Sequence, residues 1–165
     1  MTDKLHWMEN LTRDEESADT MWSAFMRHVE EAGRADILKN PTVLDLGGGK
    51  GEFSKYLNAN GIKSASLEIK NLEANPGANQ VRADAYHMPF ADGSFDVIYG
   101  RGSLDTFLYS HDFSKLLPEI ARVLKDKGIF YTWDNRELNK EEAERYFRKL
   151  LKEHGDDFIG VWEKI

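Results

Sequence analysis

Four glycines stand within five residues at positions 47–51, directly after an apolar run that ends at Asp45, in the stretch VLDLGGGKGEF. A buried strand that ends in such a turn allows the backbone to approach a ligand closely. The turn also aims the N-terminus of the following helix at that ligand. The stretch therefore predicts a strand–turn–helix unit with a ligand at the turn.

Apolar strand patterns alternate with helical patterns through the middle of the chain. A helix follows the glycines and ends at Gly61, and a second covers about 114–127. This alternation predicts a three-layer α/β sandwich of the Rossmann-like kind, with a mostly parallel sheet and helices on both faces. The predicted strands are 42–46, 63–69, 79–84, 94–100 and 128–134.

The N-terminal segment, residues 1–40, is predicted to be helical. Thr12-x-x-Glu15 fits a capping box, and Gly33 is a plausible end. Trp22 and Phe25 lie on the apolar stripe of this helix, where they could be core residues or part of a lid over a ligand. The stripe consists of Ala18, Met21, Trp22, Phe25, Met26 and Val29.

The C-terminal segment, residues 135–165, is predicted to form one long helix and one strand. Asn139-x-x-Glu142 opens the helix and Gly155 ends it, and FIGVWEKI at 158–165 has a strand pattern. With a cofactor-binding core at 41–134, the whole chain is predicted to be one domain with a shortened C-terminal strand region. A missing strand would leave an exposed sheet edge, where a second copy or a partner protein could dock.

Composition excludes several functions. The formal net charge of −7 argues against bulk nucleic-acid binding, and the chain has no cysteine for a disulfide, a thiolate metal site or a Cys nucleophile. No metal site is predicted. The opening residues are too charged for a secretory signal and no run is long enough to span a membrane, so we expect a cytoplasmic protein.

Two phosphate-binding motifs fit the glycine cluster poorly. Glu52 stands where a P-loop counted from Gly47 needs its second glycine, and where a dinucleotide fingerprint needs its third. A carboxylate in the first helical turn would also oppose a pyrophosphate. A nicotinamide oxidoreductase is therefore the less favoured alternative.

The spacing Asp45-x-Gly47-x-Gly49-x-Gly51 resembles the first motif of the class I S-adenosylmethionine-dependent methyltransferases. The resemblance continues through SLEI, through RADAYHMPFADGSFDVIYG at 82–100 and through LLPEIARVLKDKGIFYTW at 116–133. It covers residues 42–134 in order. It implies S-adenosyl-L-methionine as cofactor and S-adenosyl-L-homocysteine as product.

The resemblance also implies which residues bind this cofactor. Asp45 would help to hold the ammonium, the glycines would admit the methionine and ribose parts, and Glu68 would accept from the ribose. Ile69, Asp84 and Ala85 would surround the adenine, and Gly100 and Arg101 would offer backbone carbonyls. The complete set is Asp45, Gly47, Gly48, Gly49, Gly51, Glu68, Ile69, Asp84, Ala85, Gly100 and Arg101.

Each carboxylate also has an ordinary structural explanation. Asp45 could cap the turn, Glu68 could be a solvated strand end, and Asp84 could form an Asx-turn. Asp96, inside the fourth strand, is expected to bond to neighbouring backbone and to have no catalytic role.

Two residues are candidates for the chemistry itself. His111 could be a general base or a surface histidine, and Asp105 could orient an acceptor or cap a turn. The resulting hypothesis is methyl transfer to a small molecule or to an exposed group of a partner protein. A non-catalytic cofactor-binding or regulatory subunit is the alternative, favoured by the short C-terminal segment.

Overall fold

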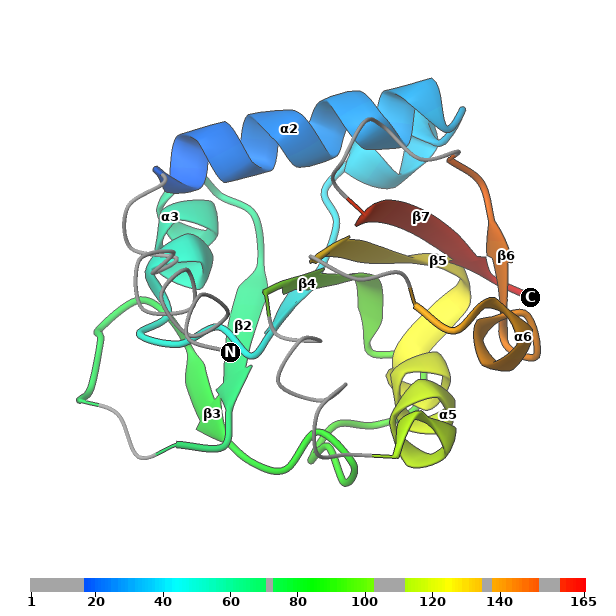
Figure 1. Cartoon of the computed structure of the whole chain (residues 1–165). Helices are drawn as coiled ribbons and strands as arrows, with labels where there is room; N and C mark the ends of the chain where they lie inside the picture. The colour runs from blue at the N-terminus through cyan, green and yellow to red at the C-terminus, as the bar shows by residue number, and fades with distance from the viewer. Residues whose placement is uncertain (1–16, 71–72, 103–111, 135–137, 152–157) are drawn as a thin grey trace, which may run out of the picture.

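Strand β1 (Val43–Leu46) is an interior strand of a seven-stranded sheet in the order β3-β2-β1-β4-β5-β7-β6. The computed structural model describes residues 17–70, 73–102, 112–134, 138–151 and 158–165 (Figure 1). Strands β1 to β5 pair in parallel, and β7 is antiparallel to both neighbours. The predicted three-layer α/β fold is confirmed.

The helices and strands follow the predicted alternation through the middle of the chain. The five predicted strands are present. The last of them begins at Leu124 instead of 128, so the helix predicted over about 114–127 ends at Val123. In chain order the elements are α2 (Ala18–Glu31), η1 (Ala35–Leu38), β1, α3 (Glu52–Ala59), β2 (Ser64–Glu68), β3 (Gln80–Arg82), β4 (Phe95–Arg101), α5 (Phe113–Val123), β5 (Leu124–Asp134), α6 (Lys140–Ala143), β6 (Phe147–Lys149) and β7 (Phe158–Lys164).

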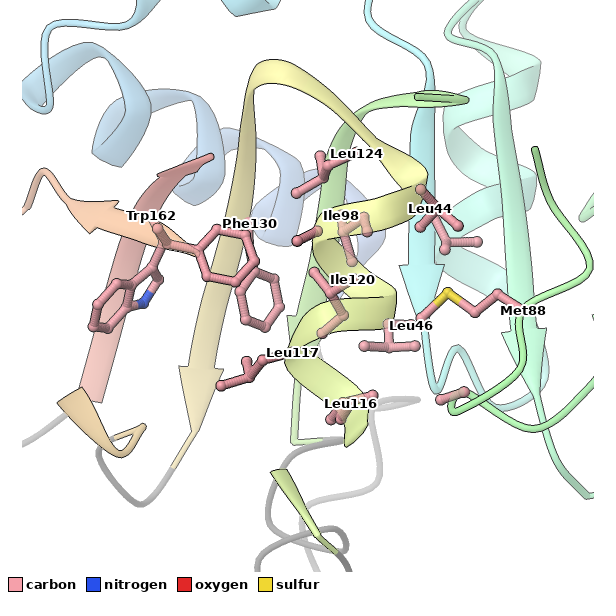
Figure 2. Close-up of a cluster of buried hydrophobic side chains, with 14 of the residues drawn as sticks. Leu44, Leu46, Met88, Ile98, Leu116, Leu117, Ile120, Leu124, Phe130 and Trp162 are labelled. Atoms are coloured by element: carbon pink, nitrogen blue, oxygen red, sulfur yellow. The ribbon is translucent and has the colours of Figure 1, made fainter. Parts of the chain in front are cut away.

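Both faces of the sheet are buried, which explains why its central strands are almost continuously apolar. On one face, α5 packs Leu117 and Ile120 into the cluster that holds Ile98 and Phe130 (Figure 2). On the other face, α2 and α3 cover the alternate side chains of the same strands. Figure 1 shows α2 and α5 on opposite sides of the sheet.

Helix α2 is a core helix in the described part of the chain. Phe25 is completely buried, and its ring meets Tyr131 edge-on at 5.2 Å between centroids. Trp22 stacks on Phe25 at 4.9 Å, so the lid interpretation does not hold for these two residues. The helix begins with Ser17 as its N-cap, whose hydroxyl accepts from the Thr20 amide. The predicted capping box at Thr12 lies outside the described residues.

The predicted long C-terminal helix is wrong. Helix α6 ends at Ala143, and the chain then forms β6, which pairs with β7 and completes a seven-stranded sheet. The predicted shortened strand region is therefore wrong as well. Phe147 packs on one face of the sheet and Leu151 on the other, which a single helical stripe cannot do. Main-chain pairing with β7 outweighs the local helical pattern.

No helix within the described ranges has the length and apolar character that a membrane crossing needs.

Replacing Phe25 with alanine should lower the free energy of unfolding by about 3–5 kcal/mol in the absence of any ligand, because it empties a fully buried ring position. Urea denaturation followed by circular dichroism measures this. Met26→Ala, at the half-buried neighbour, should cost about 1 kcal/mol. Equal small losses in both variants would contradict the core position of Phe25.

Candidate functional site

The carboxyl ends of β1, β2, β3 and β4 meet at one edge of the sheet, because these strands are parallel. Strand order reverses at β1, which has β2 on one side and β4 on the other. In open α/β sheets, ligands bind outside the carboxyl ends at this reversal. The predicted site residues after these strands are therefore brought to a common edge.

The glycine loop, residues Gly47–Gly51, is held against β2 by main-chain bonds. The amides of Gly47 and Gly48 both donate to the Leu67 carbonyl, at 2.8 and 3.2 Å. Gly51 has φ +78° and caps α3, so the loop enters the helix in the left-handed region that glycine tolerates. The predicted strand–turn–helix unit is confirmed.

Gly48 is required by a close approach of side chains. A methyl group there would collide with the Ser66 hydroxyl and lie 2.5 Å from Oδ2 of Asp45. Asp45 is completely buried at the end of β1, directly opposite Ser66 of β2. Sequence reasoning did not single out Ser66, although the alternation of small and apolar residues in SASLE places it on the same face as Glu68.

Glu68 joins the end of β2 to the glycine loop. Its Oε2 accepts from the Gly49 amide at 3.3 Å, and its Oε1 accepts from the amides of Ile69 at 2.9 Å and Lys70 at 3.1 Å. A carboxylate can accept about four hydrogen bonds, so acceptor capacity remains on this half-buried group. The geometry is that of a preorganised acceptor and differs from a freely solvated strand end.

Ile69 projects into solvent beside this carboxylate. Its side chain is 61% exposed, and among the described residues only Ile165 is another exposed large hydrophobic residue. A single exposed apolar side chain is ordinary on a protein surface, so Ile69 is of interest only for its place beside Glu68 at this edge.

Asp84 adopts the predicted Asx-turn, and its side chain remains partly exposed to solvent. Its Oδ1 accepts from the Tyr86 amide at 2.9 Å, while Oδ2 lies 4.0 Å from Nδ1 of His87. The side chain remains 45% exposed, and the following Ala85 is buried. The turn therefore fixes the direction of the carboxylate and leaves one oxygen accessible.

Gly100 and Arg101 end β4 beside the glycine loop. Gly100 is the register partner of Leu46 on β1, and the Arg101 guanidinium lies 4.7 Å above the centre of the Trp133 ring. The Gly102 amide donates to the Trp133 carbonyl at 3.1 Å, which holds the end of β4 against β5. These two positions thus reach the same edge as Asp45 and Glu68.

The two candidate catalytic residues, Asp105 and His111, lie outside the described residues.

Asp96 has the structural role that the sequence predicts. Its Oδ2 accepts from the Thr42 amide at 2.8 Å, and Nζ of Lys125 lies 2.9 Å from both carboxylate oxygens.

Replacing Gly48 with alanine should lower the free energy of unfolding by about 1–3 kcal/mol through overpacking. Adding Ser66→Ala should recover part of this loss, because it removes one of the two colliding atoms. The control is Gly49→Ala, where the added methyl meets no atom within 4 Å and the cost of about 1 kcal/mol comes from φ +55°. Simple additivity of Gly48→Ala and Ser66→Ala in urea denaturation would rule out the collision.

A family model described as a methyltransferase domain matches residues 44–132, more than half of the chain. Glycine/sarcosine/dimethylglycine N-methyltransferase of Actinopolyspora halophila is 33% identical over 110 residues, covering 59% of this chain and 19% of that protein. Sterol 4-C-methyltransferase strm-1 of Caenorhabditis elegans is 33% identical over 134 residues, covering 72% of this chain and 39% of that protein. The chain spans less than half the length of these two curated relatives.

Among solved structures, a TehB-like SAM-dependent methyltransferase from Corynebacterium glutamicum has a TM-score of 0.60 with this chain. The match covers 89% of this chain and 97% of that one at 18% sequence identity, so it shows a shared fold. The family match runs from the centre of β1 to near the end of β5, and so includes the glycine loop and the strand ends around it. The chain therefore belongs to the methyltransferase-domain family.

Proposed function

We propose that this chain is a cytoplasmic methyltransferase that binds S-adenosyl-L-methionine at the glycine loop and transfers its methyl group to a small-molecule acceptor. The observation that carries the proposal is the link between the Gly49 amide and the Glu68 carboxylate, within a chain segment that matches the methyltransferase family. This hydrogen bond holds the Glu68 carboxylate, a hydrogen-bond acceptor, beside the glycine loop.

The donor and acceptor chemistry of the site fits this cofactor. Apart from its carboxylate, S-adenosylmethionine presents an ammonium, a sulfonium, two ribose hydroxyls and an adenine amino group, which are positive or hydrogen-bond donating. The site presents carboxylates at Asp45, Glu68 and Asp84, which accept hydrogen bonds and favour positive charge. A pyrophosphate would meet repulsion from the same groups, which weighs against a nicotinamide dinucleotide.

The proposed roles follow the position of each residue along the edge. Asp45 would favour the ammonium through its charge, and Glu68 would accept from the ribose hydroxyls. Ile69 would cover one face of the adenine with its exposed side chain, and Asp84 would accept from the amino group through its accessible oxygen. The Ala85 amide would donate to the adenine ring, and Gly100 and Arg101 would offer backbone carbonyls toward the ammonium.

When bound, the cofactor would supply an electrophilic methyl group on its sulfonium, with S-adenosylhomocysteine as the product. The chain's own contribution is alignment, since the strand ends hold both reacting groups in one place. Asp105 is proposed to orient the acceptor and His111 to take its proton. The names of the two relatives refer to an amine and a sterol, so a small molecule is the proposed acceptor, with an exposed group of a partner protein as the alternative.

The non-catalytic alternative loses its main argument, because β6 completes the sheet that the sequence pattern left short. The proposed partner contact at the C-terminal sheet edge now falls on β6, which has only three residues. Light scattering of the purified chain tests whether it forms a dimer.

Titration calorimetry with S-adenosylmethionine, S-adenosylhomocysteine and nicotinamide adenine dinucleotide tests the cofactor. We expect saturable binding of the first two, weakened about tenfold to a hundredfold by Glu68→Gln and by Asp84→Asn, because each variant removes a charged acceptor. Glu73→Gln, at an exposed carboxylate, is the matched control and should bind as the wild type does. Binding of the dinucleotide alone would overturn the proposal.

His111→Gln should lower kcat at least about tenfold and leave the Kd for S-adenosylhomocysteine unchanged, because general-base catalysis contributes to the transfer step alone. The assay measures S-adenosylhomocysteine formation with a panel of amines, phenols and carboxylic acids. An unchanged kcat would remove His111 from the mechanism. Cofactor binding with no product from any acceptor class would favour the non-catalytic subunit.

A further inference from the structure

Arg122, on the last turn of α5, holds the segment that follows Asp84. Its guanidinium donates to the carbonyls of Met88 at 3.0 Å and Phe90 at 2.8 Å, and to Oδ1 of Asp92 at 2.8 Å. Its own backbone carbonyl accepts from the Gly93 amide at 2.9 Å. One residue of α5 thus binds four groups of residues 84–93, which we call the adenine loop.

Glu119, one turn earlier on α5, completes this attachment. Its carboxylate accepts from Nε and Nη2 of Arg122 at 2.8 and 2.7 Å, in a two-pronged pair. Its Oε1 also accepts from the Met88 amide at 2.7 Å. Both backbone groups of Met88 are therefore bound to the Glu119–Arg122 pair, while the Met88 side chain is buried in the core (Figure 2).

The beginning of the adenine loop is attached to the other end of α5. The Tyr86 hydroxyl accepts from the Asp112 amide at 3.0 Å, and Asp112 is the N-cap of the helix. The loop is therefore fixed to α5 at Tyr86 and again at Met88–Gly93. Asp84 and Ala85 are the residues immediately before the first attachment.

Burial and charge indicate which of these contacts is strong. The Glu119 side chain is only 15% exposed and Arg122 is 31% exposed, whereas Asp92 is 82% exposed, so its ion pair contributes little. The Arg122 guanidinium holds the pKa of the Glu119 carboxyl below its usual range, so both groups are charged at neutral pH. The planar guanidinium reaches five acceptor atoms on four residues, a geometry that lysine cannot reproduce.

We propose that the Glu119–Arg122 pair positions the adenine loop, and through it Asp84 and Ala85, so that α5 sets the affinity of the chain for the adenine end of its cofactor. The inference rests on the proposed function, because it assumes that the adenine lies at Asp84. The hydrogen bonds of both side chains go to each other and to residues 88–92, not to Asp84 or Ala85, so both are positioning residues.

The test compares Arg122→Gln and Arg122→Lys with Arg34→Gln. Arg34 is a matched control, since it also forms a two-pronged pair, with Asp36, and donates to a backbone carbonyl, that of Lys127. It contacts Glu163 of β7, away from the adenine loop. Calorimetry with S-adenosylhomocysteine should give a Kd about fivefold to tenfold higher for both Arg122 variants and an unchanged Kd for Arg34→Gln.

Two further readouts separate positioning from a general loss of stability. Amides of residues 85–94 should exchange with deuterium faster in Arg122→Gln and at the wild-type rate in Arg34→Gln, without any ligand. The affinity loss should also shrink with S-inosylhomocysteine, whose base has a carbonyl in place of the amino group that Asp84 would accept.

The outcomes distinguish the two hypotheses. Equal Kd values in the Arg122 variants and the wild type, with S-adenosylhomocysteine bound by all, would overturn the positioning role and leave the proposed function intact. Faster exchange in a chain that binds no S-adenosylhomocysteine would overturn the proposed function, and with it the role in cofactor affinity. Equal losses with both ligands would show that Arg122 does not act through Asp84.

Discussion

Two amides of the glycine loop share the carbonyl of Leu67, and the geometry of the site depends on this contact. It ties the turn after β1 to the end of β2, one residue before Glu68. The Glu68 carboxylate accepts from the Gly49 amide, so the loop is bonded to the Leu67 carbonyl and to the Glu68 side chain at the end of β2. Gly48 makes this approach sterically possible, because any side chain there would collide with Ser66 and Asp45.

The helices on the two faces of the sheet have different relations to this edge. Helix α2 packs its aromatic residues on β4 and β5 and belongs to the core. Helix α5 packs the opposite face and also binds the loop that carries Asp84, through Arg122, Glu119 and the N-cap Asp112. A helix that covers the sheet therefore also holds the loop that follows Asp84 and Ala85.

Local patterns predicted the parallel part of the fold because its signals are short and repeated. The turn at Asp45–Gly51, the Asx-turn at Asp84 and the structural role of Asp96 each depend on neighbouring residues or on a single adjacent strand. The prediction of a long C-terminal helix failed for the opposite reason. Residues 144–151 have a helical apolar spacing, but the backbone of β6 finds its partners on β7, 13 to 17 residues further along the chain.

The sequence by itself determined the alternation of strands and helices, the glycine turn and the carboxylates that follow the strands, since these depend on local backbone preferences and apolar periodicity. Only the tertiary structure decided that β6 completes the sheet, that Ser66 faces Gly48, and that Arg122 holds the adenine loop. Each of these is a contact between residues distant in sequence. Such contacts form only when the sheet brings them together, so no local pattern encodes them.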